Sequence, residues 1–162
     1  MTYKNIKEEI KNSIHIISLN RPDRLNAWTE DMALEIRSSM DKASNNNNTK
    51  VIILTGTGRG FCAGADMERL NSIDADERAD QNKQSPYSAF RENWPLDFQR
   101  AQTWFPSVPK PIIAAINGPA AGLGLILSMW CDIRFAAKSA IFSTAFSKRG
   151  LIAEHGLSWL LP

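Results

Sequence analysis

The sequence predicts an α/β domain, and three observations carry this prediction. Short segments rich in isoleucine, leucine and valine alternate along the chain with segments of helical pattern. The order strand, glycine-rich turn, helix occurs twice, with the turns at residues 55–67 and 117–124. A chain of 162 residues fits one domain of ordinary size, which buries roughly two thirds of the surface of its unfolded chain. We therefore expect one core domain over residues 1–162.

The first half of the chain contains two expected strands and one expected helix. Residues 14–19, "IHIISL", predict a strand that ends in the turn residues "NRPDR". Thr29 suits the N-cap of a helix that begins at Glu30 and ends at the polar run "SNNNN". Residues 51–54, "VIIL", predict a strand buried on both faces that leads into the first glycine-rich turn. The polar residues 71–90 lack a clear period, and we expect a mobile excursion there.

The second half predicts further strands and helices. Aromatic residues and leucine at 94–105 predict a helix that packs on an apolar surface. Residues 112–116, "IIAAI", predict a second buried strand, and "LILSMW" predicts a helix that follows the second glycine-rich turn. The remaining elements are expected as short strands at 131–136 and 140–143, and as a last helix from 157 to 161.

Composition excludes several classes of protein. The 19 basic and 17 acidic residues leave a net charge of +2, too balanced for the basic face of a nucleic-acid-binding protein. Cys62 and Cys131 are far apart and lack a C-x-x-C partner, so neither a disulfide framework nor a zinc site is expected. No apolar run reaches the ~18 residues needed to span a bilayer, and the N-terminus lacks a secretory signal. We expect a cytoplasmic protein without a metal, nucleic-acid or membrane partner.

The two glycine-rich turns have a spacing that limits what they can bind. The first reads Gly56-x-Gly58-x-Gly60, which differs from the dinucleotide fingerprint G-x-G-x-x-G, and no helix opens directly after it. Backbone N–H groups left unpaired at a strand-to-helix junction can instead stabilise a developing oxyanion, and glycine lets a ligand approach the main chain. The alternative is that the glycines only make tight turns and close helix packing. The presence of two such turns favours a ligand.

Three segments resemble one enzyme family. "GRGFCAGADM" and "KPIIAAINGPAAGLGLILSMWCDIRFA" resemble the two signature segments of the enoyl-CoA hydratase/isomerase family, the crotonases, and "NRPDRLNAW" resembles its N-terminal segment. The resemblance covers about residues 13–66 and 109–162. It implies a crotonase-like spiral of ββα units and an acyl-CoA substrate, so that coenzyme A belongs to the substrate and no separate cofactor is expected. It also implies a homo-oligomer, a trimer or dimer of trimers, for a full-length member.

The resemblance also assigns roles to individual residues. It implies that the N–H groups of Ala65 and Leu123 form an oxyanion hole for the thioester carbonyl. Two fixed donors of this kind stabilise the enolate oxygen by about 3 kcal/mol each. It further implies a coenzyme A path along the "NRPDRLNAW" segment, with the carbonyl of the first alanine of "AGAD" near the adenine. The residues expected to bind the substrate are Arg24, Leu25, Ala27, Ala63, Gly64, Asp66 and Gly122.

Glu154 is the expected acid/base. Typical hydratases of the family carry two glutamates, at positions that are Ile126 and Phe146 in this chain. Glu154 follows eight residues after Phe146, where some isomerase and dehalogenase branches place their working carboxylate. We expect apolar neighbours, Leu151 and Ile152 among them, to raise its pKa toward neutrality. The alternative is that Glu154 only caps the following helix.

Other polar residues are expected to have structural roles. His155 orients Glu154, serves as an auxiliary acid, or starts the last helix in solvent, and the last of these roles is favoured. Cys62 lacks an evident histidine partner and is expected to pack as a small residue. His15 is expected to be structural, and Asp132 to pair with backbone or with a neighbouring arginine. Three aromatic residues either wall the acyl pocket or fill the core: Trp94, Trp104 and Phe105.

Two functions remain open at this point. With one carboxylate, the simplest chemistry is isomerisation of the double bond of an enoyl-CoA, while hydration stays possible if Glu154 serves as both base and acid. The chain ends at Pro162, whereas members of the family continue into C-terminal helices that cover the site and form trimers. The alternative is therefore a truncated, catalytically impaired acyl-CoA-binding or assembly module.

Overall fold

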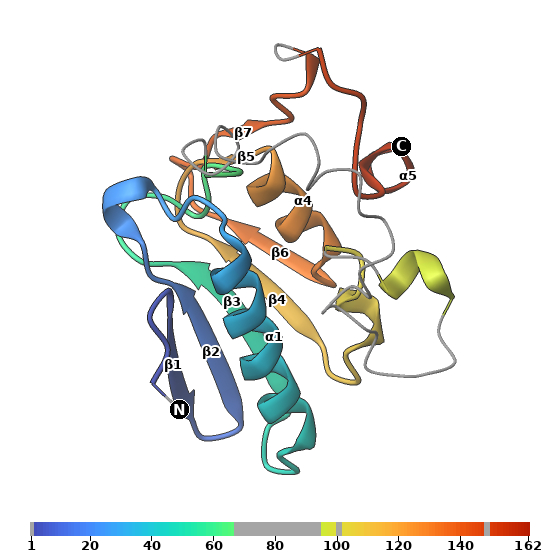
Figure 1. The fold of residues 1–162 in the computed structure, drawn as a ribbon. Helices are drawn as coiled ribbons and strands as arrows, with labels where there is room; N and C mark the ends of the chain where they lie inside the picture. Colours follow the sequence, from blue (N-terminus) through green and yellow to red (C-terminus); the bar gives the residue numbers. More distant parts are fainter. Residues whose placement is uncertain (1, 67–94, 100–101, 148–149) are drawn as a thin grey trace.

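The computed structural model describes residues 2–66, 95–99, 102–147 and 150–162, and it has two β-sheets (Figure 1). The larger sheet has five strands, of which the first two pair antiparallel and the others parallel. Their spatial order is β1 (Ile6–Lys11), β2 (Ile14–Leu19), β3 (Val51–Gly56), β4 (Ile112–Ile116) and β6 (Ile133–Ala136). The smaller sheet pairs β5 (Ala120–Ala121) with β7 (Phe142–Ser143) in parallel. The predicted α/β class is confirmed.

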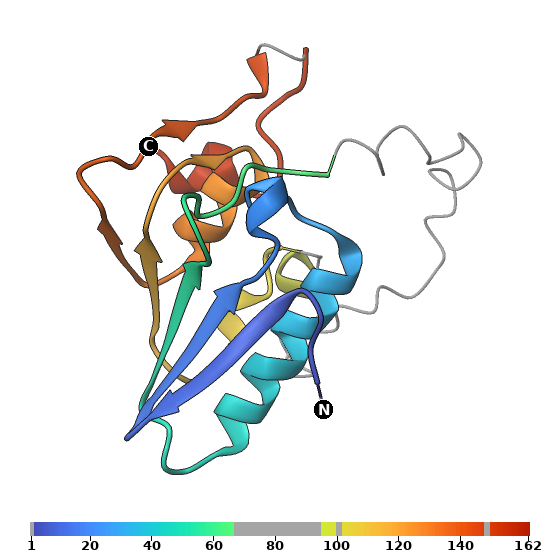
Figure 2. The same cartoon turned by 90° about the vertical axis from the view of Figure 1, so that its left-hand side faces the viewer.

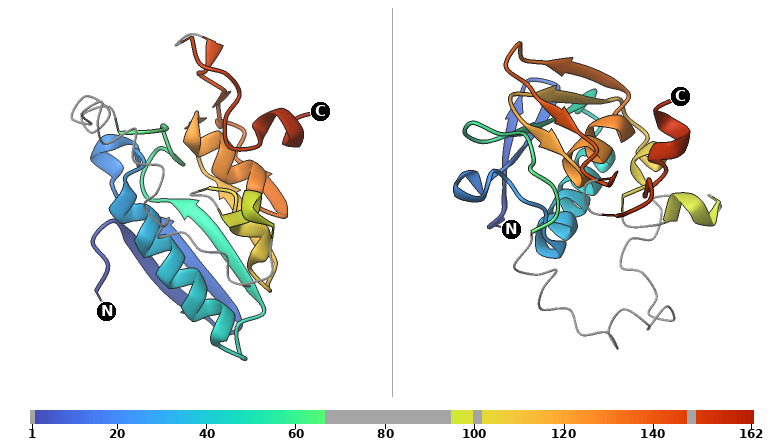
Figure 3. Two further views of the ribbon diagram at one scale, coloured as in Figure 1. Left: turned by 45° about the vertical axis from the view of Figure 1, so that its right-hand side comes forward. Right: turned by 90° about the horizontal axis from the view of Figure 1, so that it is seen from above.

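The second half of the chain winds as two ββα units. Strand β4 in the large sheet leads to β5 in the small sheet and then to helix α4 (Leu123–Trp130). Strand β6 leads in the same way to β7 and then to helix α5 (Leu157–Leu160) (Figure 3). Cys62 forms an isolated parallel bridge with Ala120, so the segment after β3 takes the corresponding place beside the small sheet.

Helix α1 (Glu30–Asn45) begins where the sequence predicts. The side chain of Thr29 accepts a hydrogen bond from the N–H of Met32 at 3.2 Å, which caps the first turn. The helix packs on β1 and β2 (Figure 2). Its buried side follows a helical period and consists of Met32, Ala33, Ile36, Ser39, Met40 and Ala43.

Only one face of the large sheet is fully buried. In β3, Ile52 and Leu54 are fully buried, whereas Val51 and Ile53 are partly exposed. The prediction that this strand is buried on both faces is therefore wrong for one of them. The physical reason is that, in the described part of the chain, the helices lie on one side of the sheet (Figure 2).

The structure differs from the sequence predictions at two further places. Strand β1 escaped prediction because only its first residue, Ile6, is buried and the other side chains are largely charged and solvated. The helix predicted at residues 94–105 is wrong for the described residues, which form two short 3₁₀ helices, Leu96–Gln99 and Phe105–Ser107. Pro106, near the start of the second, lacks the N–H that a continuing α-helix would use. Residues 71–90, Trp94 and any helix directly after Asp66 lie outside the described residues.

His15 has the structural role expected of it. Its side chain is buried, and its Nε2 lies 3.1 Å from Ser39 Oγ and 3.3 Å from Glu8 Oε1. The Ser39 hydroxyl donates to the same carboxylate at 2.7 Å, so the cluster ties α1 to β1 and β2. Burial lowers the pKa of His15, although the Glu8 carboxylate acts in the opposite direction. The imidazole is therefore neutral at pH 7.

The second glycine-rich turn packs directly on the first. A Cβ atom on Gly124, the second residue of α4, would lie under 3.0 Å from the carbonyl oxygen of Cys62, closer than real Cβ contacts come. A Cβ on Gly118 would meet the carbonyl of Arg59 in the same way. These glycines are needed because backbone lies against backbone at both points.

We expect Gly124→Ala to destabilise the fold. The added methyl group meets a backbone carbonyl that cannot move aside, and overpacking of this kind costs about 1–3 kcal/mol. At about 2–4 °C per kcal/mol for a domain of this size, the melting temperature should fall by about 2–12 °C. Gly60→Ala is the matched control, because the nearest atom to its Cβ would be Cδ2 of Leu25, at 3.3 Å, and the nearest backbone atom would lie at an ordinary contact distance of 3.7 Å. Equal melting temperatures of the two variants would contradict the close backbone contact.

Candidate active site

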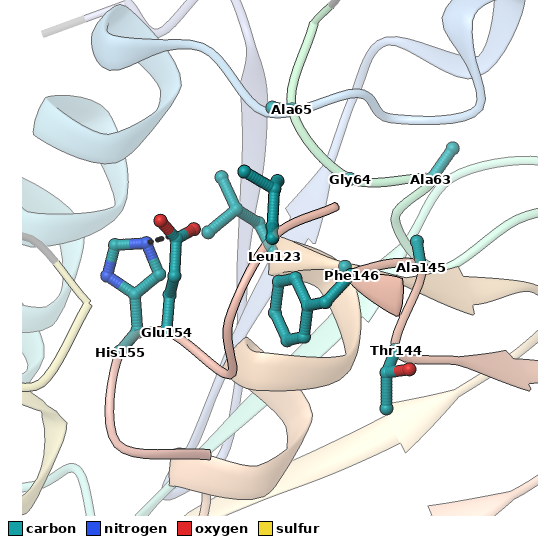
Figure 4. A pocket seen from close by; sticks show the side chains of 11 residues that line it. Ala63, Gly64, Ala65, Leu123, Thr144, Ala145, Phe146, Glu154 and His155 are labelled. Carbon is teal, nitrogen blue, oxygen red and sulfur yellow. Dashed lines mark ion pairs between the residues drawn. The ribbon is translucent and has the colours of Figure 1, made fainter. Parts of the chain in front are cut away.

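A pocket of about 290 Å³ brings together three segments that are distant in sequence. Its wall comes from the two glycine-rich turns and from the loop between β7 and α5 (Figure 4). Most of the lining is apolar or backbone, with one carboxylate and one imidazole. The lining residues are Ala63, Gly64, Ala65, Gly122, Leu123, Thr144, Ala145, Phe146, Leu151, Glu154 and His155.

The two turns are joined by main-chain hydrogen bonds at the floor of the pocket. The N–H of Ala121 donates to the carbonyl of Cys62 at 3.0 Å, and the N–H of Gly122 donates to Ser143 at 2.9 Å. Gly64 has a φ of +101°, a conformation that favours glycine, and a Cβ there would lie 3.0 Å from the carbonyl oxygen of Ala121. The first turn, the second turn and β7 therefore have fixed relative positions.

The N–H groups of Ala65 and Leu123 are among the backbone donors at this pocket that have no backbone acceptor within the described residues. Ala65 bridges Trp28 in parallel, and the bridge uses the carbonyl of Gly64 and the N–H of Asp66, so the N–H of Ala65 points to the other side. Leu123 is the first residue of α4, where an N–H has no partner inside the helix. The sequence predicted these two donors, and the structure places both residues in the wall of one pocket.

The "NRPDRLNAW" segment runs along the first turn and holds it. The carbonyl of Leu25 accepts from the N–H of Ala63 at 3.0 Å. The fully buried Asn26 donates from Nδ2 to the carbonyls of Thr57 and Gly60, at 3.0 and 2.9 Å. From the second turn, Asn117 donates to the carbonyl of Gly60 as well, at 3.2 Å. Sequence reasoning missed both asparagines, although asparagine tolerates the left-handed backbone that Asn26 adopts.

The residues expected along the coenzyme A path lie beside the pocket rather than in its wall. Arg24 ends a 3₁₀ helix, Pro22–Arg24, and is exposed, while Leu25 and Ala27 are half-buried. Asp66 is buried, and its Oδ2 lies 2.7 Å from Nη2 of Arg21, a partner that sequence reasoning missed. This ion pair fixes the start of the segment against the end of the first turn.

Glu154 and His155 face each other at the edge of the pocket. Glu154 Oε2 lies 3.9 Å from His155 Nε2, and their side chains are 45% and 31% exposed (Figure 4). Helix α5 has Gly156 as its N-cap and no capping side chain, so the alternative role of Glu154 as a cap is not observed. The favoured expectation of a solvated His155 holds in part, because its side chain is 31% exposed and lies beside Glu154. Partial burial lowers the pKa of His155, and the carboxylate partly offsets the effect.

The apolar enclosure expected around Glu154 is incomplete. Leu151 is 48% and Ile152 80% exposed, so these side chains do not shield the carboxylate from water. Phe146 lines the pocket, while Ile126 is fully buried in the core. Neither of these positions, which carry glutamate in typical hydratases, supplies a group that can transfer a proton. Among the residues that line this pocket, Glu154 is the one carboxylate.

The remaining candidates have structural roles. Cys62 is fully buried, and burial raises the pKa of its thiol to about 11, so it stays protonated and does not act as a nucleophile. Both cysteines are free. Asp132 accepts the N–H of Ile112 at 2.7 Å, as expected. Trp104 and Phe105 fill the core and are absent from the pocket wall, whereas Trp94 lies outside the described residues.

In the part of the chain that the structure describes, no three His, Cys, Asp or Glu side chains are placed to hold a metal ion. Within the same residues, no helix has the length and apolar character needed to cross a membrane.

Comparison with known proteins identifies relatives along nearly the whole chain. The family model described as enoyl-CoA hydratase/isomerase matches residues 9–162. The chain is 37% identical over 160 residues to the 1,2-epoxyphenylacetyl-CoA isomerase of Escherichia coli, covering 97% of the chain and 56% of that protein. It is 40% identical over 147 residues to the probable enoyl-CoA hydratase echA12 of Mycobacterium bovis, covering 90% of the chain and 50% of that protein. The chain thus spans about half the length of these relatives.

Solved structures of enoyl-CoA hydratases have a fold similar to that of this chain. An enoyl-CoA hydratase from Bacillus anthracis superposes with a TM-score of 0.79 at 30% identity, covering 98% of the chain and 57% of that structure. The enoyl-CoA hydratase EchA12_1 from Mycobacterium marinum superposes with a TM-score of 0.69 at 40% identity, covering 98% of the chain and 63% of that structure.

We expect the contact between Glu154 and His155 to be visible in a titration. Burial should place the midpoint of His155 below the ordinary value of 6.5, and Glu154→Gln should lower it further, because the carboxylate stabilises the imidazolium. The chain has two histidines, so a ¹H–¹³C spectrum recorded from pH 4.5 to 8 resolves both. His15 is the internal control, and its midpoint should not move. A His155 midpoint that is the same in both proteins would contradict the contact.

Proposed function

The chain belongs to the enoyl-CoA hydratase/isomerase family and has the crotonase fold, and on this basis we propose that it moves a proton between two carbon atoms of an acyl-CoA thioester. One observation carries the proposal. Two backbone N–H groups without a backbone acceptor among the described residues and one carboxylate, Glu154, belong to the wall of a single pocket.

The N–H groups of Ala65 and Leu123 would bind the thioester carbonyl. When a proton leaves the carbon atom next to this carbonyl, the electron pair of the C–H bond moves toward the carbonyl oxygen, which gains negative charge. Fixed donors that face this oxygen stabilise it more than the ground state, by about 3 kcal/mol each. The positive end of α4, at Leu123, adds to the effect.

Glu154 would take the proton and return it. In a 3-enoyl-CoA, removal of a proton from carbon 2 forms a dienolate, and return of the same proton to carbon 4 gives the 2-enoyl-CoA. No atom is gained or lost, and Glu154 ends in the state in which it began. A single carboxylate is therefore sufficient for this isomerisation.

The pocket favours isomerisation over hydration. Hydration requires a positioned water in addition to a proton donor, and the two positions that carry glutamate in typical hydratases are apolar here, with Phe146 in the pocket wall. The relatives include both an isomerase and a probable hydratase. Incubation with a 3-enoyl-CoA and with crotonyl-CoA, followed by mass spectrometry and NMR, separates the two reactions. A moved double bond without a change in mass supports isomerisation, and addition of water contradicts it.

A second candidate function is acyl-CoA binding without turnover. The observation that favours it is the openness of the site, in which Ile152 is 80% exposed and Glu154 is half-exposed. Water in such a site weakens the electrostatic stabilisation of an enolate. Binding of an acyl-CoA in calorimetry with no product from either substrate would identify this function. Both assays should use this chain and any longer natural form of the protein.

The homo-oligomer and the cytoplasmic location remain predictions. Sedimentation velocity at several protein concentrations tests the trimer or dimer of trimers, and a fluorescent fusion expressed in cells tests the location.

We expect Glu154→Gln to abolish most of the turnover. The amide keeps the shape of the side chain but cannot accept the proton, so kcat should fall by about 10²- to 10⁴-fold with little change in KM. The control is Glu9→Gln on β1, where the carboxylate is exposed and pairs with Lys11. Turnover by Glu154→Gln at the rate of the control would contradict the assignment of Glu154 as the acid/base.

We expect Leu123→Pro to remove one donor and keep the fold. Proline is well tolerated at the first position of a helix, where the missing N–H makes no intrahelical bond. The kcat should fall by about 10²- to 10³-fold, the usual loss for one oxyanion donor. Leu123→Ala loses the same side chain but keeps the N–H, and should retain most activity. If the alanine variant loses as much activity as the proline variant, the N–H is not the active group.

A further inference from the structure

The loop between β7 and α5 carries Glu154, and its described residues 150–156 belong to no helix or strand. Four of its described residues have positive φ angles: Ala145 (60°), Gly150 (67°), His155 (52°) and Gly156 (80°). Most of its described residues are exposed, including Leu151 and Ile152. Conformations of this kind persist only where the surrounding structure holds them. The position of Glu154 therefore depends on contacts with the rest of the molecule.

One such contact is made at His155, the residue after Glu154, by Trp130, the last residue of α4. The indole Nε1–H of Trp130 donates to the carbonyl oxygen of His155 at 2.9 Å, across 25 residues of sequence. Trp130 is buried, with 7% of its surface exposed. The indole has one donor and no acceptor, so this bond satisfies it fully.

The ring of Trp130 also holds the next residue. A Cβ atom on Gly156 would lie 2.7 Å from Cζ2 of the ring, so glycine is needed for the loop to come this close. The ring itself has aromatic neighbours on other elements. Phe98 meets it edge-on at 6.1 Å between centroids, and Trp159 lies at 6.0 Å. Trp130 is therefore a fixed support against which the loop is seated.

Helix α4 connects this support to the other half of the proposed site. Its first residue, Leu123, supplies a backbone N–H to the pocket, and its last residue, Trp130, holds the loop. Seven steps of an α-helix separate the two positions by about 10 Å. Residues inside the helix, among them Ile126 and Leu127, are fully buried, so the helix cannot shift without disturbing the core.

We propose that Trp130 is a positioning residue that holds Glu154 at a fixed place relative to the N–H of Leu123, with α4 as the common rigid support. This inference rests on the proposed function, because it concerns the proton transfer assigned to Glu154. Misplacement of a reacting group by about 1 Å can cost 10²-fold in rate, so a looser loop lowers turnover even when the substrate still binds.

Trp130→Phe tests this role, with Trp159→Phe as the matched control. The phenylalanine keeps an aromatic ring in the core but cannot donate to the His155 carbonyl. The kcat should fall by about 10- to 100-fold with an unchanged KM. Trp159 is 68% exposed, and phenylalanine at this position keeps an aromatic ring beside Trp130 and leaves the bond from Trp130 to His155 intact. The control should therefore turn over at the rate of the unmodified protein.

A second readout needs no turnover. Burial is the main cause of the low pKa of His155, and Glu154 is the charged group that acts on it among the described residues. When the loop loosens in Trp130→Phe, the midpoint of His155 should move toward 6.5, while that of His15 stays in place. If Trp130→Phe fails to fold, Gly156→Ala serves instead, because its methyl group displaces the loop from the intact ring. It should reproduce both effects.

The outcomes separate this inference from the proposed function. Full activity of Glu154→Gln overturns the proposed function whatever Trp130 does. Loss of activity in Glu154→Gln, together with an unchanged kcat and an unchanged His155 midpoint in Trp130→Phe, overturns the positioning role alone. An equal loss of kcat in Trp159→Phe also overturns it, since the indole bond to the loop would then not be the cause.

Discussion

The direct contact between the main chains of the two glycine-rich turns is the constraint on which the rest of the structure depends. Side chains cannot be accommodated between the turns, because Cβ atoms on Gly118 or Gly124 would meet backbone carbonyls of the first turn. The hydrogen bond from Ala121 to Cys62 closes the same contact. Two stretches of chain about 60 residues apart thereby bring Ala65 and Leu123, whose N–H groups have no backbone acceptor among the described residues, to one pocket. Glycine at these positions is thus a requirement of the site as well as of the fold.

Helix α4 links this contact between the turns to the loop that carries Glu154. The helix begins at the pocket and ends at Trp130, whose indole holds the loop that carries Glu154. The donors have a rigid scaffold, whereas the carboxylate stands on a loop with positive φ angles and exposed apolar neighbours. In the proposed site, the groups that would bind the carbonyl therefore have fixed positions, whereas the position of the proposed acid/base would depend on one aromatic support. The half-exposed state of Glu154 follows from that difference.

Much of the fold could be predicted from sequence because its signals are local. Strands β2 and β4 have the predicted bounds, since alternate residues of each strand are buried in the core, and Thr29 caps α1 through its own side chain. Strand β1 could not be predicted, because it is stabilised mainly by pairing with β2. The contacts of Asn26, Arg21 and Trp130 were missed for the same reason. Each depends on a partner that only the folded chain brings near, and the exposure of Ile152 is likewise a property of tertiary packing.

The carbonyl stretch of a bound thioester tests most directly whether the two turns act on one oxygen. A non-reacting acyl-CoA with a ¹³C label at the thioester carbonyl can be followed by difference infrared spectroscopy as it binds. If the N–H groups of Ala65 and Leu123 both donate to this oxygen, the C=O bond weakens and the band should move to lower frequency than in water. In Leu123→Pro the shift should become smaller. A band that stays at its frequency in water while the ligand is bound would contradict the proposed site.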